Sequence, residues 1–226
     1  MQGPTGSGQG GWSAFQLANA VSEPVSIALR RPVPLGVDLE IVADEASEQW
    51  RMVNPNGDET IMIAEPATTN FAVTDPVTVA DAHVARQRTP ATSENHGAPN
   101  CFSCGLHHPS MKVHPGDLGD GRFATDFRIP DWVSADYALE GLQWAALDCV
   151  AAMYVSYSGE PRDMFFTVQI AVQIHEPIQR GAEYSVVGWQ GSYQPDWDGR
   201  KRGAASAMFD ADGNCIGQAD TFWLAV

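Results

Sequence analysis

The sequence lacks long hydrophobic runs and is poor in basic residues, and both absences exclude classes of function. An apolar stretch such as 142–147 is far shorter than the roughly 20 residues that a membrane-spanning helix needs. Thirteen Lys and Arg residues stand against 28 Asp and Glu residues, which gives a formal net charge of −15. Such a chain repels nucleic acid and anionic membranes, so we expect neither as a partner. An anionic substrate would have to meet a local basic patch.

Cysteine is scarce too, and the N-terminal residues lack the features of a secretion signal. The segment 1–11, MQGPTGSGQGG, has neither a basic end nor an apolar core. We therefore expect a cytoplasmic protein, in which the four cysteines are reduced thiols rather than disulfides. With 226 residues, 44% of them hydrophobic, the chain is sufficient for one large globular domain or two small ones.

The most informative stretch is a long apolar helix, predicted over 137–154 from YALEGLQWAALDCVAAMY. Apolar residues recur there at spacings of three and four without a proline, and a helix that is apolar on nearly all sides is usually buried. Asp148 lies in its middle. Burial of a carboxylate is costly unless it is hydrogen-bonded, and desolvation raises its pKa. Asp148 is therefore either a structural acid bonded to nearby backbone or a general base in a dry pocket.

Glycines precede a second, shorter helix. Residues 3–11 are rich in glycine and lead into an uncharged helix predicted over 12–21. The N–H groups at such a helix start can hold a developing negative charge; alternatively, the glycines only let a frayed N-terminus pack closely. A capping residue and a Pro near its start predict another short helix over 74–87. Apolar alternation and turn signals predict strands over 25–31, 37–42, 48–53, 60–64, 121–129, 165–174, 182–188, 204–209 and 216–226.

The segment 101–109, CFSCGLHHP, contains a Cys-x-x-Cys pair followed by two histidines. Such a group could hold a zinc ion through Cys101, Cys104, His107 and His108. The other two cysteines are distant in the sequence and the histidine spacing is not that of a standard zinc site, so a structural turn is favoured. We assign no metal and no other cofactor to the chain from its sequence.

Two segments of the chain align with each other without a gap. The segment 25–42, VSIALRRPVPLGVDLEIV, matches 170–187, IAVQIHEPIQRGAEYSVV, with a Pro, a Gly and the apolar phase in common. Each follows a helix with few or no charges and precedes an Asn-Gly or Asp-Gly turn. The chain is therefore predicted to contain two copies of one helix-and-strands unit. The first, shortened repeat spans 1–88, a linker with the Cys-x-x-Cys pair spans 89–116, and the second repeat spans 117–226.

Two such units side by side form an α+β double hotdog, in which an antiparallel sheet wraps around two central helices. Four segments carry a family resemblance here: GPTGSGQGGWSAFQLANA, CFSCG, LEGLQWAALDC and HEPIQRGAEYSV. In order and spacing they resemble the acyl-CoA thioesterase II-like double hotdog proteins of the thioesterase superfamily and their actinobacterial relatives. The resemblance covers most of residues 3–226.

The resemblance implies a hydrolase of acyl-CoA or acyl-carrier thioesters, with a role in fatty acid metabolism. Proteins of that family use an Asp, a Thr or Ser, and a Gln to hold and activate a water. Asp148 and Thr167 stand at the Asp and Thr positions, whereas Thr221 stands at the Gln position in the last strand. Gln218 is a candidate replacement for that Gln. The altered position supports a second hypothesis, a non-catalytic acyl-thioester binding protein, which the retained Asp148 disfavours.

Elementary chemistry gives a physical account of these residues that stands beside the resemblance, and it is the resemblance that favours Asp148 as the base. Asp148 would take a proton from the attacking water, and Thr167 would orient that water, unless Thr167 is only a strand-forming residue. Glu140, eight residues earlier on the same helix, is the alternative base. A hydratase or dehydratase ranks last, because no Asp and His pair occurs on one loop. Backbone N–H groups would stabilise the oxyanion at Gly10, Gly11 or Trp12.

The remaining predictions concern the substrate and the oligomer. Arg200, Lys201 and Arg202 form the local basic patch that could meet the phosphates of coenzyme A, or they are solvated hairpin charges. The first helix carries no carboxylate, so the double unit should have one active site. Exposed sheet edges suggest a homodimer, although the chain already forms an internal pair. Five tryptophans could line an acyl pocket or simply belong to the core: Trp132, Trp144, Trp189, Trp197 and Trp223.

Overall fold

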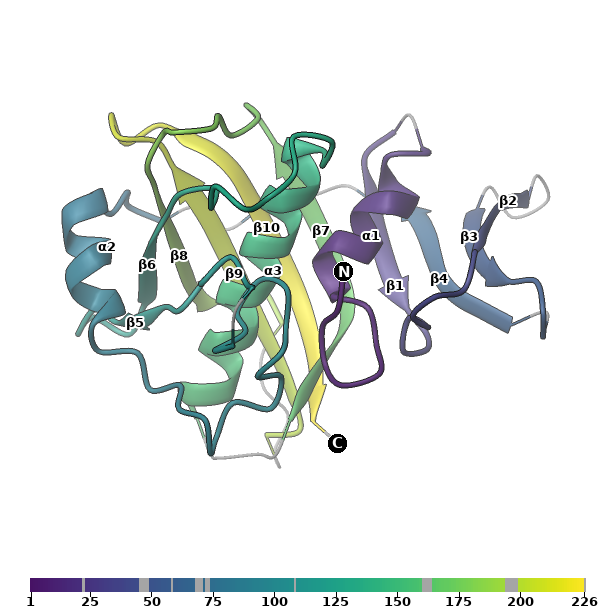
Figure 1. The fold of residues 1–226 in the computed structure, drawn as a ribbon, viewed down its shortest axis with the longest axis horizontal. Coiled ribbons are helices and arrows are strands. Elements are labelled where there is room, and N and C mark those ends of the chain that lie inside the picture. Colours follow the sequence, from purple (N-terminus) through teal and green to yellow (C-terminus); the bar gives the residue numbers. More distant parts are fainter. Residues whose placement is uncertain are drawn as a thin grey trace.

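The computed structural model describes residues 1–226 except 22, 45–48, 58, 68–70, 72–73, 108, 160–163, 194–198 and 226. Across the described ranges the chain forms three helices and one ten-stranded antiparallel sheet (Figure 1). The elements are α1 (Gly10–Ala18), β1 (Val25–Leu29), β2 (Glu40–Asp44), β3 (Gln49–Asn54), β4 (Glu59–Pro66), α2 (Val79–Arg86), β5 (Gly116–Asp117), β6 (Phe123–Phe127), α3 (Leu139–Tyr157), β7 (Phe165–Ile174), β8 (Tyr184–Gln190), β9 (Lys201–Phe209) and β10 (Cys215–Ala225).

The strand order repeats one unit twice. The sheet runs β2-β3-β4-β1-β7-β10-β9-β8-β6-β5, so the order outward from β1 matches the order outward from β7. Ser26 of β1 pairs with Ala171 of β7. In the alignment of 25–42 with 170–187, Ser26 and Ala171 are equivalent positions. If a twofold axis passes between β1 and β7, the residues that pair next to this axis must be equivalent to each other, as these two are. The strand order is therefore the same on both sides of the central β1 and β7 pair, over the four strands from each outward.

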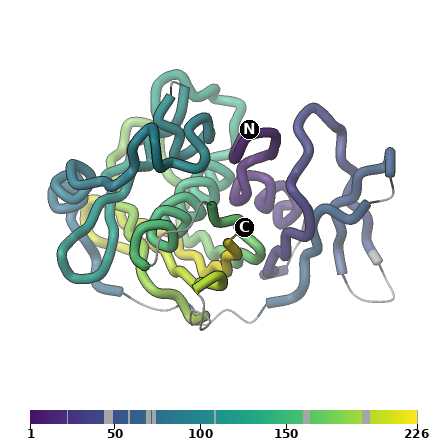
Figure 2. Tube along the Cα trace, turned by 90° about the horizontal axis from the view of Figure 1, so that it is seen from below, coloured from purple at the N-terminus to yellow at the C-terminus, as the bar shows by residue number. Residues whose placement is uncertain are grey.

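Helix α3 lies in the hollow of the second half of the sheet. Figures 1 and 2 both place it between the strands β7 to β10 and the loop that precedes β5. Its buried side chains, among them Leu142, Leu147 and Val150, form a core cluster with residues of β8, β9 and β10. Burial on nearly all sides explains the apolar sequence of this helix. The helix begins two residues later and ends three residues later than predicted.

Helix α1 is shorter than predicted and starts earlier. It begins at Gly10 because the side chain of Gln9 accepts a hydrogen bond from the Trp12 N–H at 2.6 Å, and it ends at Ala18. The helix packs against α3 and against the first half of the sheet, where Leu17 joins a cluster with Ile27 and Met62. This packing brings the N-terminus of α1 to the middle of α3.

Helix α2 covers the other face of the sheet. Its buried Ala82 and Ala85 pack against Ala124, Val187 and Ala207 of β6, β8 and β9. Thr78, rather than Thr74, caps the helix, so it starts later than the sequence pattern indicated. Although α2 falls within residues 1–88, it therefore packs on strands of the second half. The two-residue strand β5 was absent from the sequence prediction.

The segment between α2 and β5 is folded tightly over α3. Ser103 donates to the Ala145 carbonyl at 2.9 Å, and the side chain of Lys112 donates to the Leu106 carbonyl at 2.8 Å. Phe102 and Val113 are buried against the α3 cluster. The predicted linker thus closes the side of α3 that the sheet leaves open. None of the described helices combines the length and apolar character needed to cross a membrane.

Candidate active site

Asp148 lies on the middle turns of α3 with 3% of its surface exposed. One carboxylate oxygen, Oδ2, accepts hydrogen bonds from the Gln9 side-chain amide at 2.6 Å and from the Gly11 N–H at 2.9 Å. The other, Oδ1, accepts one from the Thr167 hydroxyl at 2.9 Å. These three donors come from the residue before α1, from α1 itself and from β7. They supply the partners that a buried carboxylate requires.

Two glycines allow α1 to approach this closely. A Cβ atom on Gly11 would lie 2.4 Å from the Trp144 carbonyl oxygen and 2.6 Å from the Asp148 Cβ. A Cβ on Gly10 would lie 2.9 Å from the Thr167 hydroxyl oxygen. The sequence analysis gave two alternative roles for these glycines, close packing of the N-terminal segment and contact of the helix start with a negative charge. In the structure the glycines have both features. The charge that meets the Gly11 N–H is the Asp148 carboxylate.

Burial raises the pKa of Asp148 to about 7, against the lowering effect of its three hydrogen-bond donors. The Gly11 N–H also lies at the positive end of the α1 dipole, which favours the ionised carboxylate. The balance between burial and these hydrogen bonds leaves Asp148 with a carboxyl group that can accept and release a proton near neutral pH.

Thr167 is positioned by an irregularity of the sheet. The pairing of β7 with β10 shifts register between Phe222 and Trp223, and Trp223 is the residue opposite Thr167. A bulge of this kind re-aims nearby side chains. The Thr167 hydroxyl gives its only proton to Asp148, so its oxygen can accept further hydrogen bonds but cannot donate another.

Gln9 is a residue of this candidate site that sequence reasoning missed. It is 2% exposed, and its amide connects the carboxylate of Asp148 with the N–H of Trp12. Because its oxygen caps α1, its nitrogen must face Asp148. Gln is not among the preferred N-cap residues, so a sequence pattern gives little reason to select it. A correct helix start at Gly10 would have been the useful signal.

The other predicted catalytic residues lie elsewhere. The Thr221 hydroxyl donates to the Ala204 carbonyl and accepts from the Trp223 indole N–H, both at 2.7 Å, within the inner face of the sheet. Glu140 lies in the first turn of α3, two turns before Asp148, and is only partly buried. Neither residue forms a hydrogen bond with Asp148 in the described part of the chain.

Gln218 is also remote from the Asp148 carboxylate. Its side chain lies 3.4 Å from those of Gln173 and His175, which are exposed, whereas the next residue, Ala219, belongs to the core around α3. Successive residues of a strand face opposite sides of the sheet. Gln218 therefore faces away from α3, and the prediction that it replaces the missing Gln is wrong.

The basic cluster at the start of β9 is divided between the surface and the interior. Arg202 is buried, donates to the carbonyl oxygens of Val155 and Gly199, and lies 4.7 Å from the centre of the Phe165 ring. Its guanidinium thus binds the last turn of α3 instead of facing solvent. The prediction that Arg202 belongs to a surface patch for phosphate groups is therefore corrected. Arg200 and Lys201 are exposed.

Of the three N–H groups predicted for the oxyanion, two have other partners. The Gly11 N–H donates to Asp148 and the Trp12 N–H donates to Gln9. The Gly10 N–H has no hydrogen-bond partner among the described residues, and this glycine is next to both Thr167 and Asp148. Gly10 therefore keeps a backbone donor that a ligand could use.

Aromatic side chains gather beside the start of α1. Trp12 lies 5.6 Å from Tyr137 and 6.0 Å from Phe102, and Phe102 lies 6.0 Å from Trp132, measured between ring centres. Trp132 is 37% exposed, so this cluster reaches the surface. Among the other tryptophans considered for an acyl pocket, Trp144 and Trp223 are buried in the core and Trp189 is partly buried. Trp197, like His108, lies outside the described residues.

Comparison with known proteins identifies the fold. No protein-family model and no curated protein matches the sequence. Among solved structures, the pyran synthase domain from module nine of the sorangicin pathway is 12% identical, with 95% of this chain and 82% of that one covered and a TM-score of 0.61. A hotdog-fold protein from Alicyclobacillus acidocaldarius is 13% identical over 98% and 88% of the two chains, with a TM-score of 0.57.

The tesB protein of Mycobacterium avium subsp. paratuberculosis is 12% identical to this chain, over 100% of it and 90% of the other, with a TM-score of 0.55. The chain has the double hotdog fold. This confirms the predicted architecture of an antiparallel sheet around two central helices, α1 and α3. The neighbours include a pyran synthase as well as the tesB protein, so the reaction has to be argued from the site.

Both halves of the double hotdog contribute to this site. Gln9 and Gly11 come from the first half, and Asp148 and Thr167 come from the second. Helix α1 contains no carboxylate at all. The Asp148 site therefore depends on the contact between the two helices and has no counterpart on α1.

Proposed function

We propose that this chain hydrolyses acyl thioesters, such as acyl-CoA, with a water molecule that Asp148 activates. The observation that supports the proposal is the set of three donors around a single buried carboxylate. Apolar side chains would fill this part of the core at lower cost than an acid with three partners. The arrangement fixes the position of both carboxylate oxygens, as a general base requires.

The hydrogen-bond count around Asp148 leaves room for a water. Oδ2 accepts two hydrogen bonds and Oδ1 accepts one, so Oδ1 keeps an acceptor position. The Thr167 oxygen keeps acceptor capacity as well. A water that donates one proton to each of these atoms would turn its lone pairs away from them. A thioester carbonyl carbon placed there would meet an oriented nucleophile.

The reaction follows from this arrangement. The water oxygen attacks the carbonyl carbon while Asp148 takes its proton, and the carbonyl oxygen becomes an oxyanion. The Gly10 N–H at the start of α1 is the backbone donor that would stabilise this charge. When the carbon–sulfur bond breaks, the thiolate leaves and takes up the proton. The products are a carboxylic acid and a thiol.

The first test is thiol release from acyl-CoAs of increasing chain length. Asp148→Asn keeps the shape of the side chain but removes the base, so we expect turnover to fall by roughly 10²- to 10⁴-fold. Glu140→Gln should retain turnover, because Glu140 lies two turns before Asp148 on α3 and forms no hydrogen bond with it among the described residues. Equal turnover of wild type and Asp148→Asn, or a comparable loss in Glu140→Gln, would contradict the assignment of Asp148 as the base.

A second candidate function is binding of acyl thioesters without hydrolysis. The observation that favours it is the use of two predicted oxyanion donors, the Gly11 and Trp12 N–H groups, within the protein. A binding protein would show a rise in melting temperature with acyl-CoA and no thiol release. The same panel of substrates separates the two functions. Acyl-CoA and acyl-carrier thioesters share the reacting bond, and either carrier fits the proposal.

A further inference from the structure

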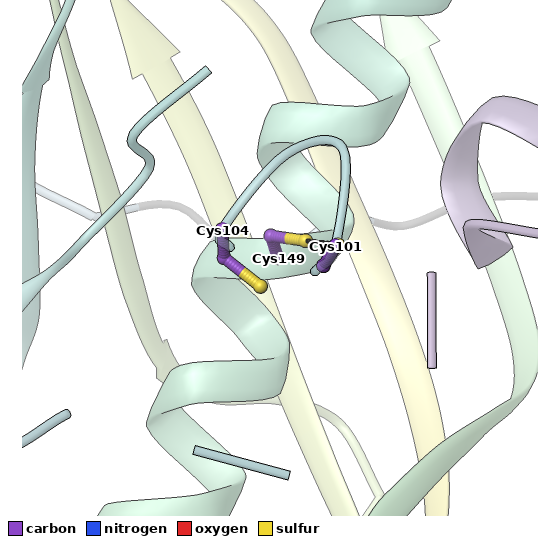
Figure 3. Close-up of side chains that lie close together, drawn as sticks. All are labelled: Cys101, Cys104 and Cys149. Atoms are coloured by element: carbon purple, nitrogen blue, oxygen red, sulfur yellow. Dashed lines mark hydrogen bonds between the residues drawn. The ribbon is translucent and has the colours of Figure 1, made fainter. Parts of the chain in front are cut away.

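Three cysteines meet in the interior next to the candidate active site. Cys101 and Cys104 lie on the turn that crosses α3, and Cys149 lies on α3 itself (Figure 3). Their sulfur atoms are all within 4.8 Å of one another, and all three residues are buried. Cys149 is distant from the other two in sequence, which is why the sequence favoured a plain turn here. The fold removes that objection.

The separation of the sulfur atoms fits a metal ion. The Cys101 and Cys149 sulfur atoms are 3.8 Å apart. Zinc–thiolate bonds of about 2.3 Å in tetrahedral geometry place two sulfur ligands about 3.8 Å apart. A disulfide would join only two of the three thiols and would need a sulfur separation of about 2.05 Å. All three sulfur atoms can therefore act as ligands with small side-chain movements.

The turn that carries two of these thiols is held in place. The Gly105 N–H donates to the Cys101 carbonyl at 2.8 Å, and a Cβ on Gly105 would lie 2.3 Å from that same oxygen. The ring nitrogens of His96 and His114 donate to the Cys104 carbonyl at 2.8 and 3.0 Å. The backbone around both cysteines is thus fixed before any ion binds, which lowers the ordering cost of binding.

A polar donor also faces the cluster. The Gln9 side-chain nitrogen donates one N–H to Asp148 at 2.6 Å. Its other N–H is within reach of two acceptors, the Ala145 carbonyl oxygen at 3.4 Å and the Cys149 sulfur at 3.5 Å. An N–H group directed at sulfur stabilises a thiolate more than a neutral thiol.

We propose that Cys101, Cys104 and Cys149 bind one zinc ion as thiolates. Three thiolates and Zn²⁺ leave one net negative charge in the interior, whereas Cu⁺ would leave two, so the divalent ion is favoured. Binding releases the three thiol protons to solvent.

No fourth His, Cys, Asp or Glu ligand joins the group among the described residues. A water or a small thiol takes the fourth position. The ion fixes the turn to α3, and this role does not depend on thioester hydrolysis.

The test is the metal content of the full chain, purified without chelators from zinc-supplemented medium. We expect one zinc per chain in the wild type and in Cys215→Ser, whose cysteine lies outside the cluster, and loss of zinc in Cys101→Ser. Replacement of zinc by Co²⁺ should give thiolate-to-cobalt charge-transfer absorption in the near ultraviolet. Wild-type protein that holds no zinc and gives no such absorption would overturn the proposal, as would copper in place of zinc.

A folding failure of Cys101→Ser does not remove the test. Wild-type protein treated with a chelator and then titrated with zinc should release protons and recover its original melting temperature. A melting temperature that neither the chelator nor zinc changes would contradict the site. Neither readout depends on hydrolytic activity, so failure of the zinc site and failure of the proposed reaction can be distinguished.

Discussion

At the scale of single residues, the site depends on a glutamine that no motif indicated. The Gln9 amide oxygen caps α1 and its nitrogen donates to Asp148, so one side chain connects the helix start to the carboxylate. The Gln that the family resemblance placed in the last strand is absent, and Thr221 there bonds within the sheet. We infer that Gln9 supplies the amide from a different element.

Replacement of Gln9 by Ala should harm both stability and turnover. Asp148 would lose its shortest hydrogen bond and the Trp12 N–H would lose its cap, which we expect to lower the free energy of unfolding by about 1–3 kcal/mol. Denaturant unfolding and thiol release measure the two effects. Gln16→Ala, an exposed position on the same helix, is the matched control. Equal results for the two variants would show that the Gln9 contacts contribute nothing.

Thr167 allows a sharper test of hydrogen bonding. Thr167→Ser keeps the hydroxyl that donates to Asp148, and we expect it to retain most activity. Thr167→Val keeps the shape but leaves Oδ1 without its donor, which should lower kcat by roughly 10- to 100-fold, as expected for a hydrogen bond to a charged group. Steady-state kinetics of the two folded variants decide this. A valine variant as active as the serine variant would mean that Thr167 only fills space.

The sequence indicated some of these residues and could not indicate others. Asp148 could be selected from the sequence because an acidic residue is unusual inside an apolar helix. Thr167 could be selected because it stands at the Thr position of the family that the sequence resembles. Gln9 sits among polar and glycine residues, where it does not stand out. Cys149 joins Cys101 only through the packing of the turn on α3, a contact across 48 positions of the chain. Local patterns contain no information on such contacts.

At the scale of elements, the close contact of α1 with α3 is what assembles the site. The start of α1 meets the middle of α3 at Gly11. The two helices also approach closely at Gly141, near the start of α3, where a Cβ would lie 2.8 Å from the rings of Trp12 and Phe15. Sequence periodicity located both helices and most strands to within a few residues. The starts were less predictable because side-chain caps set them, as Gln9 does for α1 and Thr78 does for α2.

Gly11→Ala should therefore be strongly destabilising despite the higher helix propensity of alanine. The new Cβ would overlap the Trp144 carbonyl oxygen and the Asp148 side chain, and we expect a loss of about 1–3 kcal/mol in the free energy of unfolding. Chemical denaturation measures it. Gly57→Ala is the control, because a Cβ there meets only the Glu59 side chain, with its nearest atom at 3.4 Å. Equal stability of both variants would contradict the packing described for α1.

At the scale of the whole molecule, two copies of one unit have become unequal. The sheet keeps the twofold order around the β1 and β7 pair, but α1 has 9 residues where α3 has 19. The second half provides the acid, and the first half provides two of the three groups that hold it. The repeat in the sequence predicted this architecture. The helix contact that makes one site from two halves required the structure.

In the proposed reaction, a water molecule positioned by Asp148 and Thr167 attacks the thioester. Its most direct test is a single turnover in ¹⁸O-labelled water, with the protein in excess over acyl-CoA and the product acid analysed by mass spectrometry. We expect one ¹⁸O atom in the acid formed in the first turnover and none in the protein. Unlabelled acid together with ¹⁸O in the Asp148 carboxylate would show that Asp148 attacks the carbonyl itself, and the absence of any product would contradict hydrolysis altogether.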